Sequence, residues 1–273
     1  MHGTTIPPTG AAKRTDDMTA EPGAMPAEAP GAAALLSAAE CVLFDFDGPL
    51  CRLFAARPAA GVAARLAEEL RASGCDPEVL ASRTDDPLAL LQEVAKHHGD
   101  GPVTAHAEQL LTAEEAEAAA GATPTEHALE LIGALGSGGW KQAVTTNNSP
   151  VAVARFLRRH ESSVLVAEHI HGRTSDPALL KPDPHCLVRA LESTGTVAAA
   201  AVMIGDSPAD CLAATAVGVP FIGYAVNERK RRALEDVGAR CSVRSLRGLL
   251  ETARQRVRSR EPGEGPLTAG VHG

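Results

Sequence analysis

The sequence lacks the excess of positive charge that is typical of nucleic-acid-binding proteins. Its 273 residues include 26 lysines and arginines against 34 aspartates and glutamates, which gives a formal net charge of −8. Arginines do cluster near residues 229–232 and 254–260, but solvated helix faces explain such groups without a binding role. We therefore expect no nucleic acid among the partners of this chain.

The chain also has little that would indicate a zinc site, a redox centre or a membrane anchor. Its six cysteines occur without the paired spacing of zinc or redox motifs, and we expect them to be reduced core residues. No apolar run approaches the length of a membrane span. The N-terminus has no basic segment followed by an apolar one, as a secretion signal would have. The default expectation is a cytoplasmic protein without a membrane partner.

Composition predicts an unstructured tail at each end. Residues 1–37 are rich in Ala, Pro, Gly, Thr and Glu and show no sustained periodicity, and residues 259–273 are rich in Gly and Pro. Between the tails, residues 57–125 repeat apolar side chains at helical spacing. This block is too long for a simple crossover, so we expect a helical domain inserted into a core of residues 38–56 and 126–258.

Residues typical of helix starts and ends occur in the inserted block and in the segment that follows it. Gly74 and Gly121 are expected to end helices, and Asp86-Pro87 is expected to begin one. The spacing from Thr123 to Glu126 is that of a capping box, which predicts a helix from there to residue 135.

Beyond residue 140, short apolar strands alternate with helices. Expected strands lie at residues 142–146, 164–167, 200–204, 221–225 and 241–243. Expected helices lie at residues 151–159, 185–191, 210–217, 228–237 and 246–257. This alternation predicts an α/β fold in which helices cover both faces of a doubly wound parallel sheet.

The segment 41–50 combines a buried strand with two acids. Four apolar residues run into Asp45 and Asp47, and Gly48 and Pro49 then end the run. A short apolar run that stops at turn residues predicts a buried parallel strand, and open α/β sheets bind ligands at the carboxyl ends of such strands. The two acids can converge if the chain turns at once, which Gly48 permits. Such a pair can bind a hard cation or attack an electrophile, although an ordinary polar turn is the alternative.

Polar residues also follow the later strands. Thr146 ends one strand, Lys181 precedes a helix, and Gly205-Asp206 ends another strand with Asp210 four residues further on. Together with the pair at the first strand, this order resembles the haloacid dehalogenase superfamily of phosphatases and phosphotransferases over residues 39–243. The resemblance implies a Rossmann-like core with an inserted α-helical cap. The sequence departs from the family pattern at Pro49, where Thr or Val is usual, so the shape of that loop stays open.

The resemblance implies distinct roles for the two acids of the first motif. Asp45 would be the nucleophile that forms an aspartyl-phosphate. Asp47 would be the general acid and then the base that activates water, and nearby carboxylates and partial burial would raise its pKa for this task.

The resemblance also implies that the substrate phosphoryl group meets Thr146 and Lys181. Thr146 would donate to a phosphoryl oxygen. Because Thr145 and Asn147 are also polar, the sequence leaves open which of these neighbouring residues faces the substrate, and Asn147 is included as a substrate-binding candidate. Lys181 would bring a positive charge to the nucleophile and the phosphate. The alternative for Thr146 is an ordinary hydroxyl at a strand end without a binding role. The alternative for Lys181 is a solvated lysine on the surface.

A Mg²⁺ ion is the cofactor that the resemblance implies. Asp206 would bind it directly, together with Asp45 and the backbone carbonyl of Asp47. Asp210 would support the metal or pair with the motif lysine. Its distance from Ser207 is also that of a capping box, so a purely structural role at a helix start is the alternative.

Selectivity for the substrate is expected from the inserted block. Arg83, with Asp85 and Asp86 in the same loop, is the candidate for contacting the substrate, and a polar turn with a helix cap is the alternative. Arg52 lies just after the first motif and faces either the insert or solvent.

These residues predict a Mg²⁺-dependent phosphatase of a small phosphorylated metabolite, similar to phosphoglycolate phosphatase. An acid at Asp47 favours phosphate esters over the family's dehalogenation chemistry. The first alternative is a phosphomutase of the β-phosphoglucomutase type, and the second is a non-catalytic phosphometabolite-binding protein, because a fold does not by itself give a function. Either a monomer or a homodimer is expected.

Overall fold

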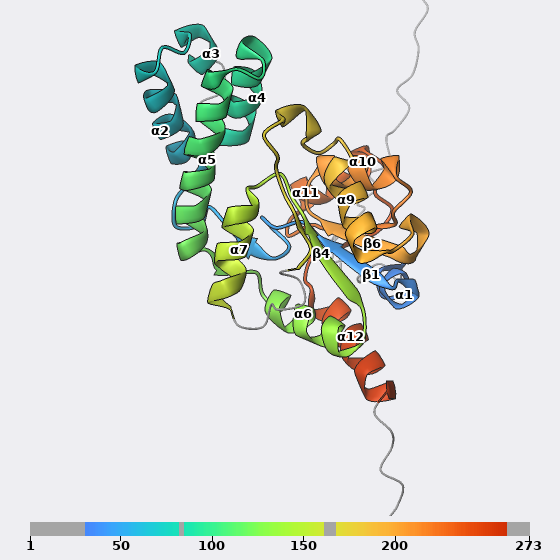
Figure 1. The fold of residues 1–273 in the computed structure, drawn as a ribbon. Coiled ribbons are helices and arrows are strands. Elements are labelled where there is room, and N and C mark those ends of the chain that lie inside the picture. Colours follow the sequence, from blue (N-terminus) through green and yellow to red (C-terminus); the bar gives the residue numbers. More distant parts are fainter. Residues whose placement is uncertain (1–30, 82–84, 161–167, 261–273) are drawn as a thin grey trace, which may run out of the picture.

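A parallel sheet lies at the centre of the protein (Figure 1), and it has six strands within the residues that the structure describes. The structure is a computed structural model, and it describes residues 31–81, 85–160 and 168–260. In spatial order the strands are β5 (Ile170–His171), β4 (Lys141–Thr145), β1 (Cys41–Phe44), β6 (Ala201–Gly205), β7 (Phe221–Tyr224) and β8 (Ser242–Val243). Every neighbouring pair is parallel. The α/β fold class expected from the sequence is therefore confirmed.

The order of the strands reverses at β1. The chain first builds outward through β4 and β5, and it then returns to the other side of β1 to add β6, β7 and β8. Such a reversal separates the loops that leave neighbouring strands and opens a crevice at their carboxyl ends. Asp45 directly follows β1 and so lies at this crevice.

Helices cover both faces of the sheet because successive strand residues point to opposite sides. Val42 and Phe44 of β1 pack in one apolar cluster, and Cys41 and Leu43 pack in another. The first cluster is completed by α1 (Gly31–Ala38), α6 (Ala128–Ser137), α7 (Pro150–Arg159) and α12 (Arg247–Arg260). The second is completed by α9 (His185–Thr194) and α10 (Pro208–Ala216), while α11 (Glu228–Asp236) packs beside α10.

Two sequence predictions about local structure are wrong. Residues 31–37 were expected in an unstructured tail, but they form most of α1, whose Leu36 is fully buried and accepts a hydrogen bond from the indole of Trp140 at 3.2 Å. The expected capping box at Thr123 does not form, because Thr123 pairs with Arg52 in a short antiparallel sheet. The following helix, α6, begins at Ala128 without a side-chain cap. The strand expected at 164–167 lies outside the described residues.

In its described residues, the insert between the first strand and the rest of the core contains four helices. They are α2 (Ala59–Ala72), α3 (Pro77–Ala81), α4 (Pro87–His98) and α5 (Pro102–Gly121). They lie together beside the core (Figure 1) and share an apolar cluster of their own. Asp86 caps α4 by accepting from the amide of Leu88 at 2.9 Å, as predicted. The two connections to the core pair as β2 (Cys51–Arg52) and β3 (Thr123–Pro124).

Helix α5 belongs to both parts of the molecule. Its first half contributes Ala107 and Leu111 to the cluster of the insert, whereas Ala118 and Ala119 lie in the main core. The expected end of the insert at residue 125 therefore assigns to the insert the last turns of α5, although these turns pack in the core. The division of the chain into domains stays a prediction.

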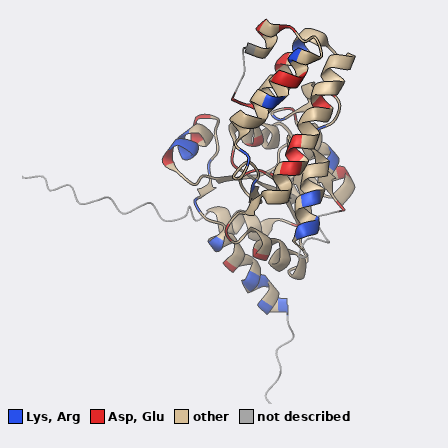
Figure 2. Cartoon of the chain, turned by 90° about the vertical axis from the view of Figure 1, so that its left-hand side faces the viewer, with Lys and Arg blue, Asp and Glu red and all other residues tan. Residues whose placement is uncertain are grey.

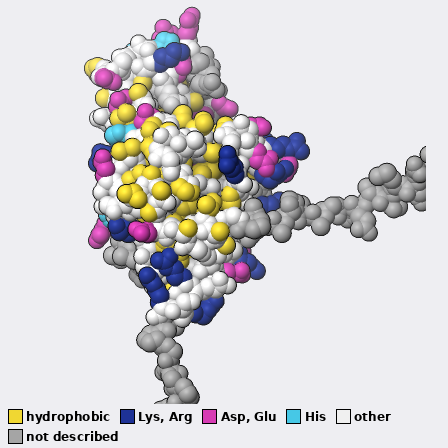
Figure 3. Space-filling model, turned by 90° about the vertical axis from the view of Figure 1, so that its right-hand side faces the viewer, with side chains coloured by type: hydrophobic (Ala, Val, Ile, Leu, Met, Phe, Trp, Pro, Cys, Tyr) yellow, Lys and Arg dark blue, Asp and Glu magenta, His cyan; other side chains and the backbone are white. Residues whose placement is uncertain are grey.

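The surface shows charges of both signs along the helices, including those of the insert (Figure 2). Apolar side chains gather on the opposite side of the molecule (Figure 3), the side on which α9 and α10 lie in Figure 1. Val188 of α9 and Leu212 of α10 are among the exposed large apolar residues. Such groups are common because polar side chains do not suffice to cover a folded surface. Within the described ranges, none of the helices combines the length and apolar character that a membrane crossing requires.

Candidate active site

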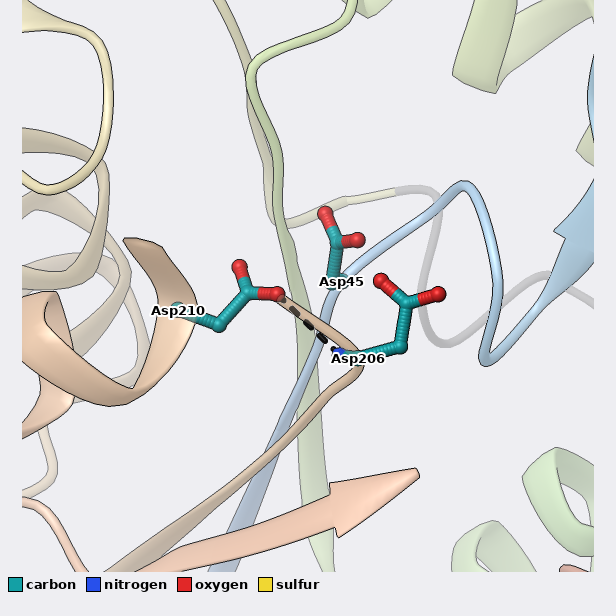
Figure 4. Close-up of side chains that lie close together, drawn as sticks. All are labelled: Asp45, Asp206 and Asp210. Carbon is teal, nitrogen blue, oxygen red and sulfur yellow. Dashed lines mark hydrogen bonds between the residues drawn. The ribbon is translucent and has the colours of Figure 1, made fainter. Parts of the chain in front are cut away.

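Three carboxylates converge at the carboxyl end of the sheet. Asp45 follows β1, Asp206 follows β6, and Asp210 lies in the first turn of α10 (Figure 4). Each offers an oxygen atom that lies within 4.8 Å of the other two. The parallel pairing of β1 and β6 accounts for the meeting of residues 161 positions apart in the chain, because Phe44 is in register with Ile204 and both strands end within one residue of this pair.

A tight turn after Asp45 places Asp47 beside the first acid. Gly48 has a φ of 122°, which side-chain-bearing residues rarely adopt, and a Cβ there would collide with the carboxylate of Asp206. The amide of Gly48 donates to the carbonyl of Cys51 at 2.7 Å. Pro49 sits inside this turn, where no ladder hydrogen bond needs its missing amide. The sequence departure at Pro49 is thus compatible with a closed turn.

The carboxyl group of Asp47 is partly buried and held by one backbone amide. Leu53 donates its amide hydrogen to Oδ1 at 2.8 Å. The pKa of Asp47 is raised to about 6, because burial and the nearby Asp45 together outweigh the hydrogen bond from Leu53, which lowers the pKa. A carboxyl group with this pKa can exchange a proton near neutral pH, which an unperturbed aspartate does poorly.

Lys181 is a buried lysine that links two of the acids, so the alternative of a solvated lysine is wrong. Its Nζ donates to Asp45 at 2.9 Å and to the carbonyl of Thr145 at 2.9 Å, and it also pairs with Asp210. Burial by itself would lower the pKa of Lys181, but the charges of Asp210 and Asp45 outweigh it, and the pKa is raised. The ammonium therefore stays charged and holds the Asp45 carboxylate in place.

The pKa of Asp45 depends on its burial and on the charged groups around it. Burial raises its pKa, Asp210 raises it further, and Lys181 counteracts both. The net result is a pKa of about 7, so Asp45 is ionised in a fraction of molecules near neutral pH, and the charge of Lys181 favours this ionised form. This is the state in which one of its oxygens can attack an electrophile.

Asp210 combines both roles that the sequence left open. Its Oδ2 accepts from the amide of Ser207 at 3.0 Å while the Ser207 hydroxyl accepts from the amide of Asp210 at 3.3 Å, which completes a capping box. Its Oδ1 pairs with Lys181. Because both oxygens are engaged, Asp210 orients the loop after β6 and the lysine.

Asp206 faces the pocket and pairs with a lysine that sequence reasoning missed. The ammonium of Lys230, in the first turn of α11, pairs with Oδ2 of Asp206. Burial raises the pKa of Asp206, Lys230 counteracts part of this effect, and the net pKa is about 6. No sequence signal singled out Lys230, because it lies in the charged segment 228–232 that resembles a solvated helix face.

Thr146 and Asn147 lie in the loop after β4, but they do not play equivalent parts. The hydroxyl of Thr146 is buried and donates to Oδ1 of Asn148 at 3.1 Å. The amide of Asn147 is engaged with the backbone of Lys181: Oδ1 accepts from its N–H at 2.7 Å, and Nδ2 donates to its carbonyl at 3.1 Å. Arg83, the third candidate for substrate binding, lies outside the described residues.

A pocket of about 770 Å³ opens next to Asp47 and Asp206. Its lining comes from the first motif, from both connections to the insert and from the segment after β7. The remaining lining residues are Gly48, Arg52, Phe54, Ala55, Thr123, Pro124, Thr125, Glu126, Tyr224, Val226 and Lys230. Arg52 thus faces a pocket, and the pocket is large enough for a small metabolite.

The donor set at this site fits a hard divalent cation. Asp45 and Asp206 supply carboxylate oxygens within 4.8 Å of each other, and Mg²⁺ prefers one or two carboxylates together with other oxygen ligands. Asp210 belongs to the same cluster, but its oxygens are already occupied by hydrogen bonds. The two strand-end acids are therefore the residues with free oxygens for a metal.

This chain is similar to several known proteins. A phosphoglycolate phosphatase of Rhodospirillum rubrum is 37% identical over 103 residues, which span 38% of this chain and 42% of that protein. The structure of CbbY from Rhodobacter sphaeroides in complex with phosphate is 21% identical, with a TM-score of 0.56 over 77% of this chain and 96% of that one. A HAD family hydrolase from Deinococcus radiodurans with bound phosphate and sodium is 26% identical, with a TM-score of 0.51 over 79% of this chain and 96% of that one.

The match to a family model extends from the turn between α1 and β1 to the loop after α10, and it includes every acid of the cluster. The model describes haloacid dehalogenase-like hydrolases and matches residues 39–218. This chain belongs to the family of haloacid dehalogenase-like hydrolases.

Proposed function

We propose that this protein is a Mg²⁺-dependent phosphatase that hydrolyses a small phosphorylated metabolite through a phosphorylated aspartate. The observation that carries the proposal is the position of Asp45 and Asp47 on one turn, with Lys181 donating to Asp45 at 2.9 Å. A nucleophile, a proton donor and a fixed positive charge are what phosphoryl transfer requires of a protein. The family relationship and the partial match to a phosphoglycolate phosphatase support it.

In the first step, one oxygen of Asp45 attacks phosphorus while the bond to the leaving oxygen breaks. Asp47 is protonated in a substantial fraction of molecules near pH 6, and it gives its proton to the leaving alkoxide. Lys181 orients the attacking carboxylate and offsets the charge of the phosphoryl oxygens.

In the second step, Asp47 acts as a base. It removes a proton from a water molecule, whose oxygen attacks the phosphorus of the aspartyl-phosphate. The bond between phosphorus and Asp45 then breaks, and inorganic phosphate leaves with the original carboxylate restored. A bound Mg²⁺, held by Asp45, Asp206 and the carbonyl of Asp47, would neutralise charge on the phosphoryl group.

The other polar residues of the site are assigned positioning or binding roles. Thr146 is proposed to donate to a phosphoryl oxygen after its hydroxyl rotates away from Asn148. Both polar atoms of the Asn147 side chain are engaged with Lys181, so we assign Asn147 the positioning of that lysine in place of substrate binding. The insert is proposed to act as a cap, because the pocket is lined by residues at both of its connections to the core.

The proposal is tested by incubating the full chain and Mg²⁺ with a broad panel of phosphate monoesters and measuring inorganic phosphate. Release from at least one small phosphorylated metabolite is expected, with loss on chelation and recovery when Mg²⁺ is restored. The Asp45→Asn protein is the control for contaminating activity. Transfer of the phosphoryl group to a second sugar position without release of phosphate would identify a mutase instead. Tight binding of a phosphorylated metabolite without either reaction would identify a non-catalytic binding protein.

A further inference from the structure

A buried ion pair joins the helical insert to the core outside the acid cluster. Glu115 of α5 is fully buried, and so is the guanidinium of Arg173, which lies in the loop after β5. Arg173 donates to Oε1 of Glu115 at 2.9 Å and to Oε2 at 3.0 Å. The planar fork of arginine matches a carboxylate in this two-bond arrangement, which fixes the direction of approach as well as the distance.

The carboxylate of Glu115 also holds the loop after β4, which we name the Thr146 loop (residues 146–149). Its Oε1 accepts from Nδ2 of Asn148 at 2.9 Å, and its Oε2 accepts from the amide of Ser149 at 2.8 Å. Each oxygen therefore receives one hydrogen bond from the arginine and one from the loop. A buried carboxylate is tolerated only when its lone pairs are satisfied in this way, so the loop is tied to the insert.

Arg173 also binds the backbone of the Thr146 loop. Its Nη1 donates to the carbonyl of Asn147 at 3.0 Å, and its own amide donates to the carbonyl of Asn148 at 3.0 Å. A further bond from Nε to Glu108, also on α5, measures 2.5 Å. The Thr146 loop is thus held on both sides by one ion pair whose acid comes from the insert.

The loop in turn holds Lys181. Asn147 accepts from the amide of Lys181 and donates to its carbonyl, so the lysine backbone is fixed against the loop. The side chain then reaches Asp45. A continuous set of hydrogen bonds therefore runs from the insert through the Thr146 loop to the lysine that orients the first acid.

We propose that Glu115 and Arg173 are positioning residues, through which the insert fixes the Thr146 loop and Lys181. The insert then contributes part of the frame of the site in addition to covering the pocket. The functional consequence rests on the proposed phosphatase activity, whereas the structural consequence, restraint of the loop, does not. The end of α5 near Glu115 has to stay with the core while a substrate enters.

The first test replaces the acid by its neutral isostere in the full chain. Glu115→Gln cannot accept from four donors, so the Thr146 loop should shift, and displacements of about 1 Å at a reacting site can cost on the order of 10²-fold in rate. We expect kcat to fall by roughly 10- to 100-fold, with a smaller change in KM. Glu117→Gln is the matched control, because Glu117 lies on the same helix and pairs with Arg155 of α7 on the surface. It should leave kcat unchanged.

A double-variant comparison separates positioning from general destabilisation. If Glu115 acts through the contact between Asn147 and Lys181, then Glu115→Gln should add little to the loss already caused by Asn147→Ala. Losses that multiply independently would overturn the proposal, and so would an unchanged kcat in Glu115→Gln. If that single variant does not fold, the pair Glu115→Gln with Arg173→Gln removes both buried charges together, which proteins tolerate better than removal of one. It should fold and show the same loss of kcat.

Hydrogen exchange gives a readout that does not depend on catalysis. The amides of Ser149 and Lys181 are both held by side chains of this network. They should exchange faster in Glu115→Gln than in Glu117→Gln, measured on peptides covering residues 146–149 and 181. Unchanged exchange in an active enzyme would overturn the positioning role alone. Faster exchange in Glu115→Gln, combined with a wild-type chain that hydrolyses no phosphate ester, would instead overturn the proposed function and leave the restraint of the loop standing.

Discussion

The ammonium of Lys230 pairs with the carboxylate of Asp206, one of the two strand-end acids proposed to bind the metal. Lys230 comes from the first turn of α11 and lines the same pocket as Asp47. A positive charge on this carboxylate competes with a divalent cation for the same carboxylate group. The protein therefore carries an internal competitor for its proposed metal.

Replacing this competitor should tighten metal binding. In Lys230→Met the repulsion between ammonium and metal is absent, and an interaction of about 1 kcal/mol corresponds to roughly a fivefold change in affinity. We expect the dissociation constant for Mg²⁺, measured by titration calorimetry on metal-free protein, to fall about threefold to tenfold.

Arg231→Met is the control for this comparison. Arg231 is the next residue on α11, but it pairs with Glu228 and Glu235 on the surface. Its replacement should leave the affinity for Mg²⁺ unchanged. Equal or weaker binding by Lys230→Met would show that the lysine does not compete for Asp206.

Gly48 provides a second prediction, since its backbone is one that only glycine adopts easily and its position leaves no room for a side chain. Gly48→Ala should lose roughly 1–3 kcal/mol of stability through the strained φ, and it should also lose most of its activity because the new Cβ collides with Asp206. Gly74→Ala is the matched control. Gly74 also has a positive φ, of 85°, but no atom lies within 4 Å of the added Cβ.

Denaturant unfolding and steady-state kinetics on the two glycine variants separate these effects. Gly74→Ala should be destabilised yet active. If Gly48→Ala kept wild-type kcat, the close approach of the first motif to Asp206 would not matter for the reaction.

The centre of the fold was predictable because it depends on local patterns. The apolar run before Asp45 is long enough to form a buried strand and too short for a helix, and it ends at residues that turn the chain. Parallel pairing then brings Asp45 and Asp206 to one edge of the sheet without further information. The N-cap at Asp86 follows from a short-range rule in the same way.

Contacts that join distant parts of the chain were not predictable from local patterns. Glu115 lies in an alanine-rich helix, and Arg173 lies in a polar loop, so neither is distinguished in the sequence. They meet only because α5 packs along α7, which positions the end of the insert against the loops of the core (Figure 1). The capping-box prediction at Thr123 failed for the opposite reason. A valid local signal was overridden when this residue paired with Arg52 across the two connections.

His171 gives the protein a dependence of stability on pH. Burial, together with the neighbouring Arg189, His169 and His185, lowers its pKa to about 4. Between about pH 6.5 and pH 4 the unfolded chain therefore binds a proton that the folded chain does not, so stability falls as the pH falls through this range. Nε2 of the His171 ring forms a hydrogen bond with Oγ of Ser193 at 2.7 Å.

In His171→Gln this proton is absent from both states. Its free energy of unfolding should therefore decline less steeply than that of the wild type between pH 6.5 and pH 4, measured by denaturant unfolding at each pH. His97→Gln serves as the control, because His97 is 45% exposed on α4. Parallel curves for the wild type and His171→Gln would contradict the lowered pKa of His171.

The division of labour between Asp45 and Asp47 can be tested with two isosteric variants. Asp45→Asn removes the nucleophile, so both turnover and phosphorylation of the protein should be lost. Asp47→Asn keeps the nucleophile and loses only proton transfer, which typically contributes about 10²- to 10⁴-fold in rate. The second variant should be slow on ordinary esters and least impaired on an aryl phosphate, whose acidic phenol leaves without a proton.

The aryl ester also separates the two steps of the reaction for Asp47→Asn. Formation of the aspartyl-phosphate needs no proton from residue 47 with this substrate, but its hydrolysis still needs a base to activate water. Rapid mixing should therefore release phenol in a burst close to one equivalent of enzyme, followed by a slow steady rate, whereas Asp45→Asn should show no burst. Equal impairment on activated and unactivated esters, without a burst, would mean that Asp47 acts through its position or charge and does not move the proton.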